Sequence, residues 1–158
     1  MVYGAILQKG ERFYTYLGKV FAAIGEVQTE YNWLITECVC YPRSPDIDTL
    51  LSREFCWLSG EELTAVIKQE DFQWIWGVLS GFEKDIPLEK VLDYPLPYAD
   101  GYEGFFKNPL SIQHPLASVE IVALDSSLTL IYSRRKEIIS KFRNYFPLSE
   151  DLTSCNET

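Results

Sequence analysis

The chain has few of the residues that most enzyme mechanisms and metal sites require. It contains one histidine, His114, and four cysteines among 158 residues. It has no G-x-S-x-G nucleophile motif, no G-x-x-x-x-G-K-[ST] or G-x-G-x-x-G phosphate loop and no C-x₂-C zinc knuckle. His114 precedes Pro115 in a stretch typical of a loop, so we interpret it as a solvated or structural side chain. The sequence therefore predicts no enzyme, no metal site and no cofactor.

The four cysteines are too few and too scattered to form a disulfide scaffold in a chain of this length. Cys38 and Cys40 stand two residues apart in a predicted strand, which places both thiols on the same side of that strand. Cys56 and His114 could complete a tetrahedral metal set only through tertiary contacts. We expect reduced thiols that pack as small hydrophobic side chains.

Long apolar runs are also missing. No uninterrupted stretch approaches the ~18–20 apolar residues that a membrane-spanning helix needs. The first residues, Met1 to Lys9, are too short for a signal peptide and lack its basic region. We therefore expect a cytoplasmic protein that does not contact a membrane.

Basic residues are outnumbered, with 14 Lys and Arg against 23 Asp and Glu and a formal net charge of −9. An acidic surface repels nucleic-acid phosphates and anionic lipid headgroups, so neither is expected as a partner. A cationic protein would be attracted and would associate faster at low salt. The alternative is that the acidity only keeps the protein dissolved.

Two periodicities divide the chain into strands and helices. Alternating apolar residues and β-branched or aromatic runs predict strands at residues 3–8, 31–41, 54–58, 72–79, 118–124 and 128–132. Helical spacing predicts helices at residues 11–24, 59–69 and 134–146, with one further turn at 88–92. This order indicates an α+β fold, with helices packed on one face of a mostly antiparallel sheet as a single pair of layers. Residues 1–147 are expected to form one domain, followed by a frayed tail at 148–158.

Several residues are expected to mark the ends of these elements. Ser59-Gly60-Glu61-Glu62 has the S-x-x-E form of a capping box, and Ser133 can cap the last helix. Asp125-Ser126-Ser127 is expected to form the hairpin turn. Pro42 to Asp46 is predicted to be a loop because of its prolines and polar residues.

The segment at residues 81–107 differs from the rest of the chain because it combines prolines, glycines, acidic residues and aromatic residues. Long irregular segments inside a domain are usually functional or mobile, and aromatic side chains anchor many interfaces. We therefore predict a partner-binding site made of Glu83, Asp85, Glu89, Asp93, Tyr94, Tyr98, Asp100, Tyr102 and Glu103. The alternative is that the tyrosines cover the edge of the core and keep their hydroxyls in water.

Three stretches give the chain a resemblance to the immunity proteins of bacterial toxin–immunity systems, including polymorphic-toxin and contact-dependent inhibition systems. They are the strand Tyr31-Asn32-Trp33-Leu34-Ile35, the hairpin at Asp125-Ser126-Ser127 and the helix Ile138-Ile139-Ser140-Lys141-Phe142. The resemblance implies a small acidic α+β protein that neutralises a basic toxin domain by occluding its working surface. It transfers no functional residue to this chain.

Two other hypotheses stay open at this stage. One is a regulatory or adaptor module without catalytic activity that forms a homodimer through its aromatic strands, whereas the binding hypothesis is compatible with a monomer. The other is a hydrolase that uses carboxylates alone, which would require a deep pocket holding an Asp or Glu with a raised pKa.

Overall fold

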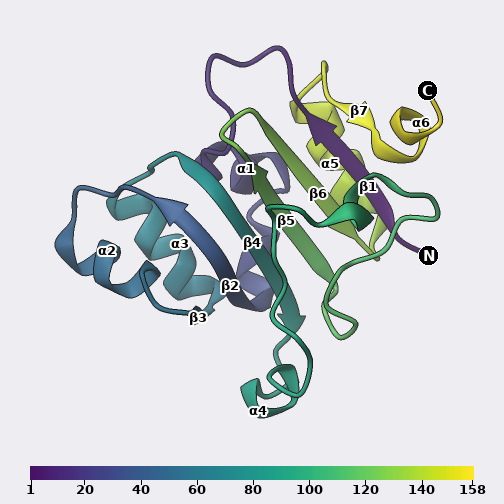
Figure 1. The fold of residues 1–158 in the computed structure, drawn as a ribbon. Coiled ribbons are helices and arrows are strands. Elements are labelled where there is room, and N and C mark those ends of the chain that lie inside the picture. The colour runs from purple at the N-terminus through teal and green to yellow at the C-terminus, as the bar shows by residue number, and fades with distance from the viewer.

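A seven-stranded antiparallel sheet organises the protein in the computed structural model, which describes residues 1–158. The strand order is β3-β2-β4-β5-β6-β1-β7 (Figure 1). The strands are β1 (Tyr3–Leu7), β2 (Tyr31–Cys40), β3 (Phe55–Ser59), β4 (Trp74–Glu83), β5 (Val119–Leu124), β6 (Leu128–Ser133) and β7 (Glu150–Asp151). The predicted α+β class and the antiparallel sheet are confirmed.

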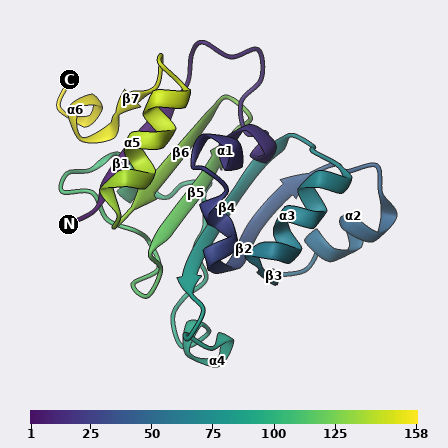
Figure 2. The same cartoon turned by 180° about the vertical axis from the view of Figure 1, so that it is seen from behind.

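The longer helices cover one face of this sheet, which we call the helix face. Figure 2 shows α1 (Leu17–Ala23), α3 (Gly60–Gln69) and α5 (Lys136–Tyr145) lying across it. The remaining helical elements are α2 (Pro45–Leu51), α4 (Leu88–Val91), α6 (Leu152–Asn156) and the 3₁₀ turns η1 (Val27–Glu30) and η2 (Glu103–Phe106). No helix combines the length and the apolar character that a bilayer crossing requires.

A third layer was not predicted. The long connection between β4 and β5, residues 84–118, lies against the opposite face of the sheet (Figure 1). We call it the covering segment, and the sheet face beneath it the covered face. Each face therefore has its own core, with 28 buried residues on the helix face and 14 on the covered face. Because both faces are buried, the strands carry apolar residues on both sides.

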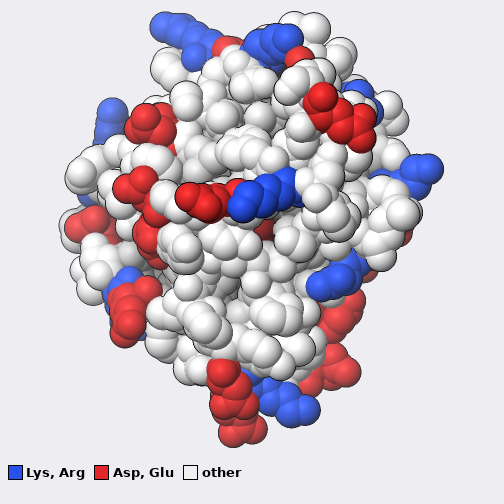
Figure 3. Space-filling view, turned by 45° about the vertical axis from the view of Figure 1, so that its right-hand side comes forward, with Lys and Arg blue, Asp and Glu red and all other residues white.

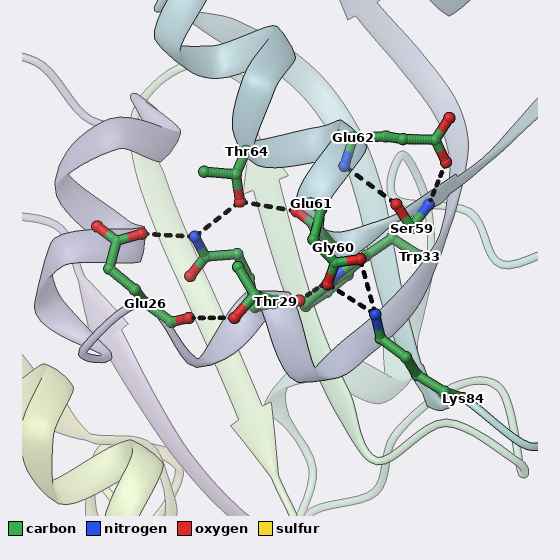
Figure 4. Close-up of polar contacts among 10 residues, drawn as sticks. Glu26, Thr29, Trp33, Ser59, Gly60, Glu61, Glu62, Thr64 and Lys84 are labelled. Atoms are coloured by element: carbon green, nitrogen blue, oxygen red, sulfur yellow. Dashed lines mark hydrogen bonds and ion pairs between the residues drawn. The ribbon is translucent and has the colours of Figure 1, made fainter.

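The residues at the start of α3 explain where this helix begins and how closely it packs against η1. Ser59 and Glu62 form the predicted capping box, with both reciprocal hydrogen bonds present (Figure 4). A Cβ atom at Gly60 would collide with the backbone carbonyl of Gln28, so glycine permits the close approach of α3 to η1. Trp33 Nε1 donates to that same carbonyl at 2.9 Å, which ties β2 to η1.

The predicted hairpin is also confirmed, with β5 and β6 paired in register from Val119–Ser133 to Leu124–Leu128. Its turn residues Asp125 and Ser126 both have positive φ, 51° and 58°. These two residues are the centre of a β-turn that the Ser127 N–H closes on the Leu124 carbonyl at 3.0 Å, and two central residues of positive φ match the twist of the flanking strands.

The helix boundaries differ from the prediction in two places. Residues 11–16 are not helical, because Thr15 has a φ of 67° and its N–H donates to the Thr129 hydroxyl, so α1 begins only at Leu17. The stretch predicted as a loop starts a helix instead: Ser44 caps α2 and Pro45 occupies its first turn, where a missing N–H is harmless.

Two expectations for the C-terminal part are wrong. Ser133 does not cap α5; the N-cap is Arg135, and the Ser133 hydroxyl accepts from the Arg135 N–H just before the helix. Residues 148–158 do not fray. They form β7, which pairs with β1, and α6, whose Leu152 is fully buried in the core of the covered face. This apolar contact explains the order of the tail.

Candidate functional site

The covering segment crosses the sheet as a strap held at separate points. Its first residue beyond β4, Lys84, pairs with Glu61 at the start of α3 at 2.7 Å (Figure 4). Farther along, Glu37 of β2 accepts from the N–H groups of Ala99 and Asp100 at 3.0 and 2.7 Å. At the other side of the sheet, the Tyr132 hydroxyl on β6 donates to the carbonyl of Phe105 at 2.8 Å. The segment thus runs from β2 to β6 over the intervening strands.

Gln113 holds the middle of the covering segment, because its side-chain amide bonds to both backbone polar groups of Tyr98. Its side-chain carbonyl accepts from the Tyr98 N–H at 2.9 Å, and its Nε2 donates to the Tyr98 carbonyl at 3.0 Å. The Gln113 N–H in turn donates to Oε2 of Glu120 on β5 at 3.1 Å. One residue therefore links the exposed chain at Tyr98 to the buried sheet.

His114 is structural rather than solvated, with an exposed fraction of 1%. Its ring packs against Phe82 of β4 and Tyr94, with centroid distances of 4.8 and 5.1 Å. Nδ1 accepts from the Leu116 N–H, so Nε2 carries the proton and donates to the Val91 carbonyl. Burial lowers the pKa of His114, which keeps the imidazole neutral in this arrangement.

Glu120 lies beneath the strap and is fully buried. Burial raises the pKa of its carboxyl to about 8, outweighing the hydrogen bond from Gln113. Its second oxygen, Oε1, has no hydrogen-bond partner, and neither does the hydroxyl of Ser80, its cross-strand neighbour on β4. At neutral pH the carboxyl is therefore protonated and acts as a neutral group in the core of the covered face.

An aromatic ladder connects the surface of the strap to this interior. Tyr98 contacts Tyr102, Tyr102 contacts Phe105 and Phe105 contacts Tyr132, with centroid distances of 5.3, 4.7 and 6.2 Å. Phe105 and Tyr132 are buried, Tyr102 is half-buried, and Tyr98 is 44% exposed. The ladder holds the outermost ring in a defined position, since each ring packs on the next.

The structure places the predicted partner-binding residues at the surface but divides them into two groups. Tyr102 is half-buried, and all the others are exposed. The first group, near α4, consists of Glu83, Asp85, Glu89, Asp93 and Tyr94. The second, which we call the tyrosine patch, consists of Tyr98, Asp100, Tyr102 and Glu103. In Figure 1, α4 extends beyond the end of β4, whereas η2 lies over the sheet. Figure 3 accordingly shows separate acidic clusters with basic groups between them, not one continuous acidic surface.

Sequence reasoning missed three residues that hold the site together, namely Glu37, Gln113 and Glu120. Nothing local distinguishes Glu37, because its role depends on a bulge in β2. The position of Glu120 could have been found, since Val122 and Leu124 follow it on the same side of β5 and are apolar. An acidic residue in such a row is expected to be buried when both faces of a strand are covered.

A concave region outside the covering segment lies beside the start of α1. Two cavities of about 460 and 220 Å³ share Tyr16 and Asp71 in their linings. Desolvation raises the pKa of Asp71, the feature that a carboxylate hydrolase would need. Its neighbour Glu70, however, accepts from the N–H groups of Arg43 and Ser44, which lowers its pKa. Glu70 is thus engaged in holding the loop before α2 instead of pairing with Asp71.

Comparison with known proteins adds no relative to this picture. No protein-family model, no curated protein and no solved structure matches the chain.

Proposed function

We propose that the protein is an acidic binding protein that attaches to a basic protein partner through the outer surface of the covering segment and occludes that partner. The observation that carries the proposal is a strap that is irregular yet anchored: Glu37, Gln113 and Tyr132 each bond to its backbone while Tyr98 is presented outward.

Anchoring matters because association costs free energy for every loop and side chain that becomes ordered. Immobilising one flexible side chain costs about 0.5–1.5 kcal/mol, and a segment already held in place avoids part of this cost. Tyr98 rests on the aromatic ladder, so its ring is ordered before a partner arrives. Tyrosines of this kind supply large contact area and a hydroxyl at many interfaces.

Charge selects the class of partner. Asp100 lies between the two tyrosines of the patch and Glu103 directly follows the second, and the whole chain carries a net charge of −9. Such a field attracts a cationic protein and accelerates its encounter. The resemblance to immunity proteins supports a basic toxin domain as this partner, and covering its substrate-binding surface would neutralise it without any chemical step.

The test is capture of a partner by immobilised protein, compared between two variants with equal charge change. Asp100→Asn with Glu103→Gln removes two charges from the tyrosine patch. Glu54→Gln with Glu157→Gln removes two exposed charges outside the covering segment. We expect wild type and the second variant to retain one basic protein, and the first variant to associate with it about tenfold more slowly at low salt.

Varying the ionic strength gives a second test of the same proposal. The association rate of the wild-type complex should fall as salt rises, because the attraction acts over roughly one Debye length, ~10 Å at 0.1 M. An association rate insensitive to both salt and the tyrosine-patch charges would contradict the electrostatic part of the proposal. Equal loss in both variants would show that net charge, not this surface, governs binding.

One observation favours the homodimer hypothesis as a second candidate. β3 is an edge strand that pairs only with β2, and its sequence Phe55-Cys56-Trp57-Leu58 carries no charge. A cavity of about 510 Å³ beside it is lined by Leu50, Phe55, Trp57 and Leu88 among others. Unpaired apolar edges recruit further strands, including those of a second copy. A solution mass of one chain would rule this candidate out.

A further inference from the structure

An irregular stretch of β2, with register shifts between Thr36 and Val39 and between Val39 and Cys40, determines where three side chains point. Pairing with β4 is regular to Thr36, then shifts so that Val39 pairs with Trp76. Glu37 occupies the bulge with a φ of 51°. As a result its carboxylate reaches the covering segment, on the covered face, whereas Cys38 and Cys40 pack against the helix-face core. Bulges re-aim side chains in this way and often occur next to functional sites.

The two thiols lie side by side on the helix face. Cys38 Sγ and Cys40 Sγ are 3.2 Å apart, and both residues are half-buried. A strand advances ~3.3 Å per residue, so Cα atoms two residues apart fall within the ~4.4–6.8 Å range of disulfides. The sulfurs would need to approach by only about 1 Å to reach the ~2.05 Å of a disulfide bond.

A small molecule can also reach the two thiols. A cavity of about 320 Å³ is lined by Cys38, Cys40 and Tyr41 on one side and by Asp48 and Leu51 of α2 on the other. Its volume admits a small peroxide. Cys56, by contrast, is buried on β3, and Cys155 lies on α6 with no other thiol in hydrogen-bond contact.

The two thiols are not equivalent. Their hydrogen bond raises the pKa of Cys38, with burial acting in the same direction, and lowers the pKa of Cys40. Cys40 therefore loses its proton first, and the Cys38 S–H donates to its thiolate. Because the thiolate is the nucleophile in thiol chemistry, Cys40 is the attacking group and Cys38 the resolving one.

We propose that Cys38 and Cys40 form a redox-active dithiol that a hydroperoxide closes to an intramolecular disulfide. The Cys40 thiolate attacks the terminal peroxide oxygen and breaks the O–O bond, giving a sulfenic acid and an alkoxide that takes up a proton to become an alcohol. Cys38 then attacks the Cys40 sulfur, an S–S bond forms and water leaves. The two thiols lose two electrons, and the peroxide gains them.

The experiment treats the intact protein with hydrogen peroxide, digests it with trypsin and weighs the peptide of residues 20–43, which contains both thiols. We expect this peptide to lose two hydrogen atoms in wild type and to regain them after a thiol reductant. The same result is expected for Cys56→Ser and for Cys155→Ser, because neither residue takes part.

Single variants separate the two roles. Cys38→Ser should leave Cys40 reactive but unable to form a disulfide, so that the peptide gains oxygen. Cys40→Ser should react about tenfold more slowly, because the pKa of the remaining thiol is not lowered. The proposal is overturned if the wild-type peptide keeps both thiols under peroxide, or if its disulfide joins Cys56 instead. Both outcomes are read from the wild-type protein, so they do not depend on the folding of a variant.

Discussion

The two faces of the sheet are covered in different ways. On the helix face, α1, α3 and α5 bury a core of 28 residues, and their backbone polar groups bond within the helices. On the covered face, the covering segment, together with Leu152 of α6, closes a core of 14 residues, and this segment depends on individual side chains for its backbone partners. Unpartnered polar atoms at Ser80 and Glu120 lie beneath it.

Because of this difference, we expect one face of the sheet to contribute most of the stability and the other to bind the partner. A helix satisfies its own hydrogen bonds, so its outward face is free to vary but presents a uniform, charged surface. A segment held only by separate anchors can present backbone groups, tyrosine rings and carboxylates together on one surface. Its local stability is lower than that of a helix. The covering segment is thus the part of the molecule in which recognition is expected, and the helix face the part that holds the fold together.

The largest expected effect belongs to the helix face. Phe142 on α5 is fully buried and packs against Phe146 at a centroid distance of 5.0 Å. Phe142→Ala should lower the free energy of unfolding in urea by about 3–5 kcal/mol, through lost burial and the remaining cavity. Tyr145→Ala on the same helix is the control: that side chain is 48% exposed, and a change below about 1 kcal/mol is expected.

The next effect belongs to the covered face and depends on pH. The Glu120 carboxyl ionises at its usual 4.5 in the unfolded chain but only near 8 in the folded protein. The contribution of Glu120 to wild-type stability should therefore be fully present below pH 4.5, fall as pH rises to about 8, and stay level above it. Glu120→Gln keeps an acceptor for Gln113 and does not titrate, so it should remove this dependence.

The change in the pKa of Glu120 sets the size of that effect. The full pKa change corresponds to roughly 4–5 kcal/mol at ~1.36 kcal/mol per unit. Local opening of the strap lets the ionised carboxylate reach water, so we expect Glu120→Gln to gain on the order of 3 kcal/mol at pH 9 in urea unfolding. Equal pH profiles for wild type and variant would show that Glu120 is not buried as described.

The smallest effect concerns the anchors. Gln113→Ala removes both side-chain bonds to Tyr98, and Glu37→Ala removes the acceptor of Ala99 and Asp100. Each change should speed amide hydrogen exchange at its own partners by about fivefold, because one hydrogen bond contributes about 1 kcal/mol. Exchange in α3 and α5 should not change. Acceleration across the whole sheet would mean that the strap is not a separate unit.

The sequence predicts best those features that neighbouring residues determine. The capping box at Ser59 and the hairpin turn at Asp125 were both found from local patterns alone. The order of the tail and the start of α1 depend on distant partners, Leu152 against the covered face and Thr15 against Thr129, and both were predicted wrongly. No local pattern reports such contacts.

For the candidate site, composition indicated a segment but not its arrangement. Prolines, tyrosines and acids mark residues 81–107, and the structure places these acids and tyrosines at the surface. The division into an α4 group and a tyrosine patch arises because Glu37 and Gln113 hold the chain near Tyr98. Both anchors act across long separations in sequence, one through a bulge and one through a side-chain amide, so periodicity could not reveal them.

The central claim is that the outer surface of the covering segment contacts the partner. The most direct measurement is amide hydrogen exchange of the protein alone and in complex with its captured partner. Added protection is expected within residues 93–106, with none in α1, α3 or α5. Protection confined to the helix face, or to β3, would contradict the claim.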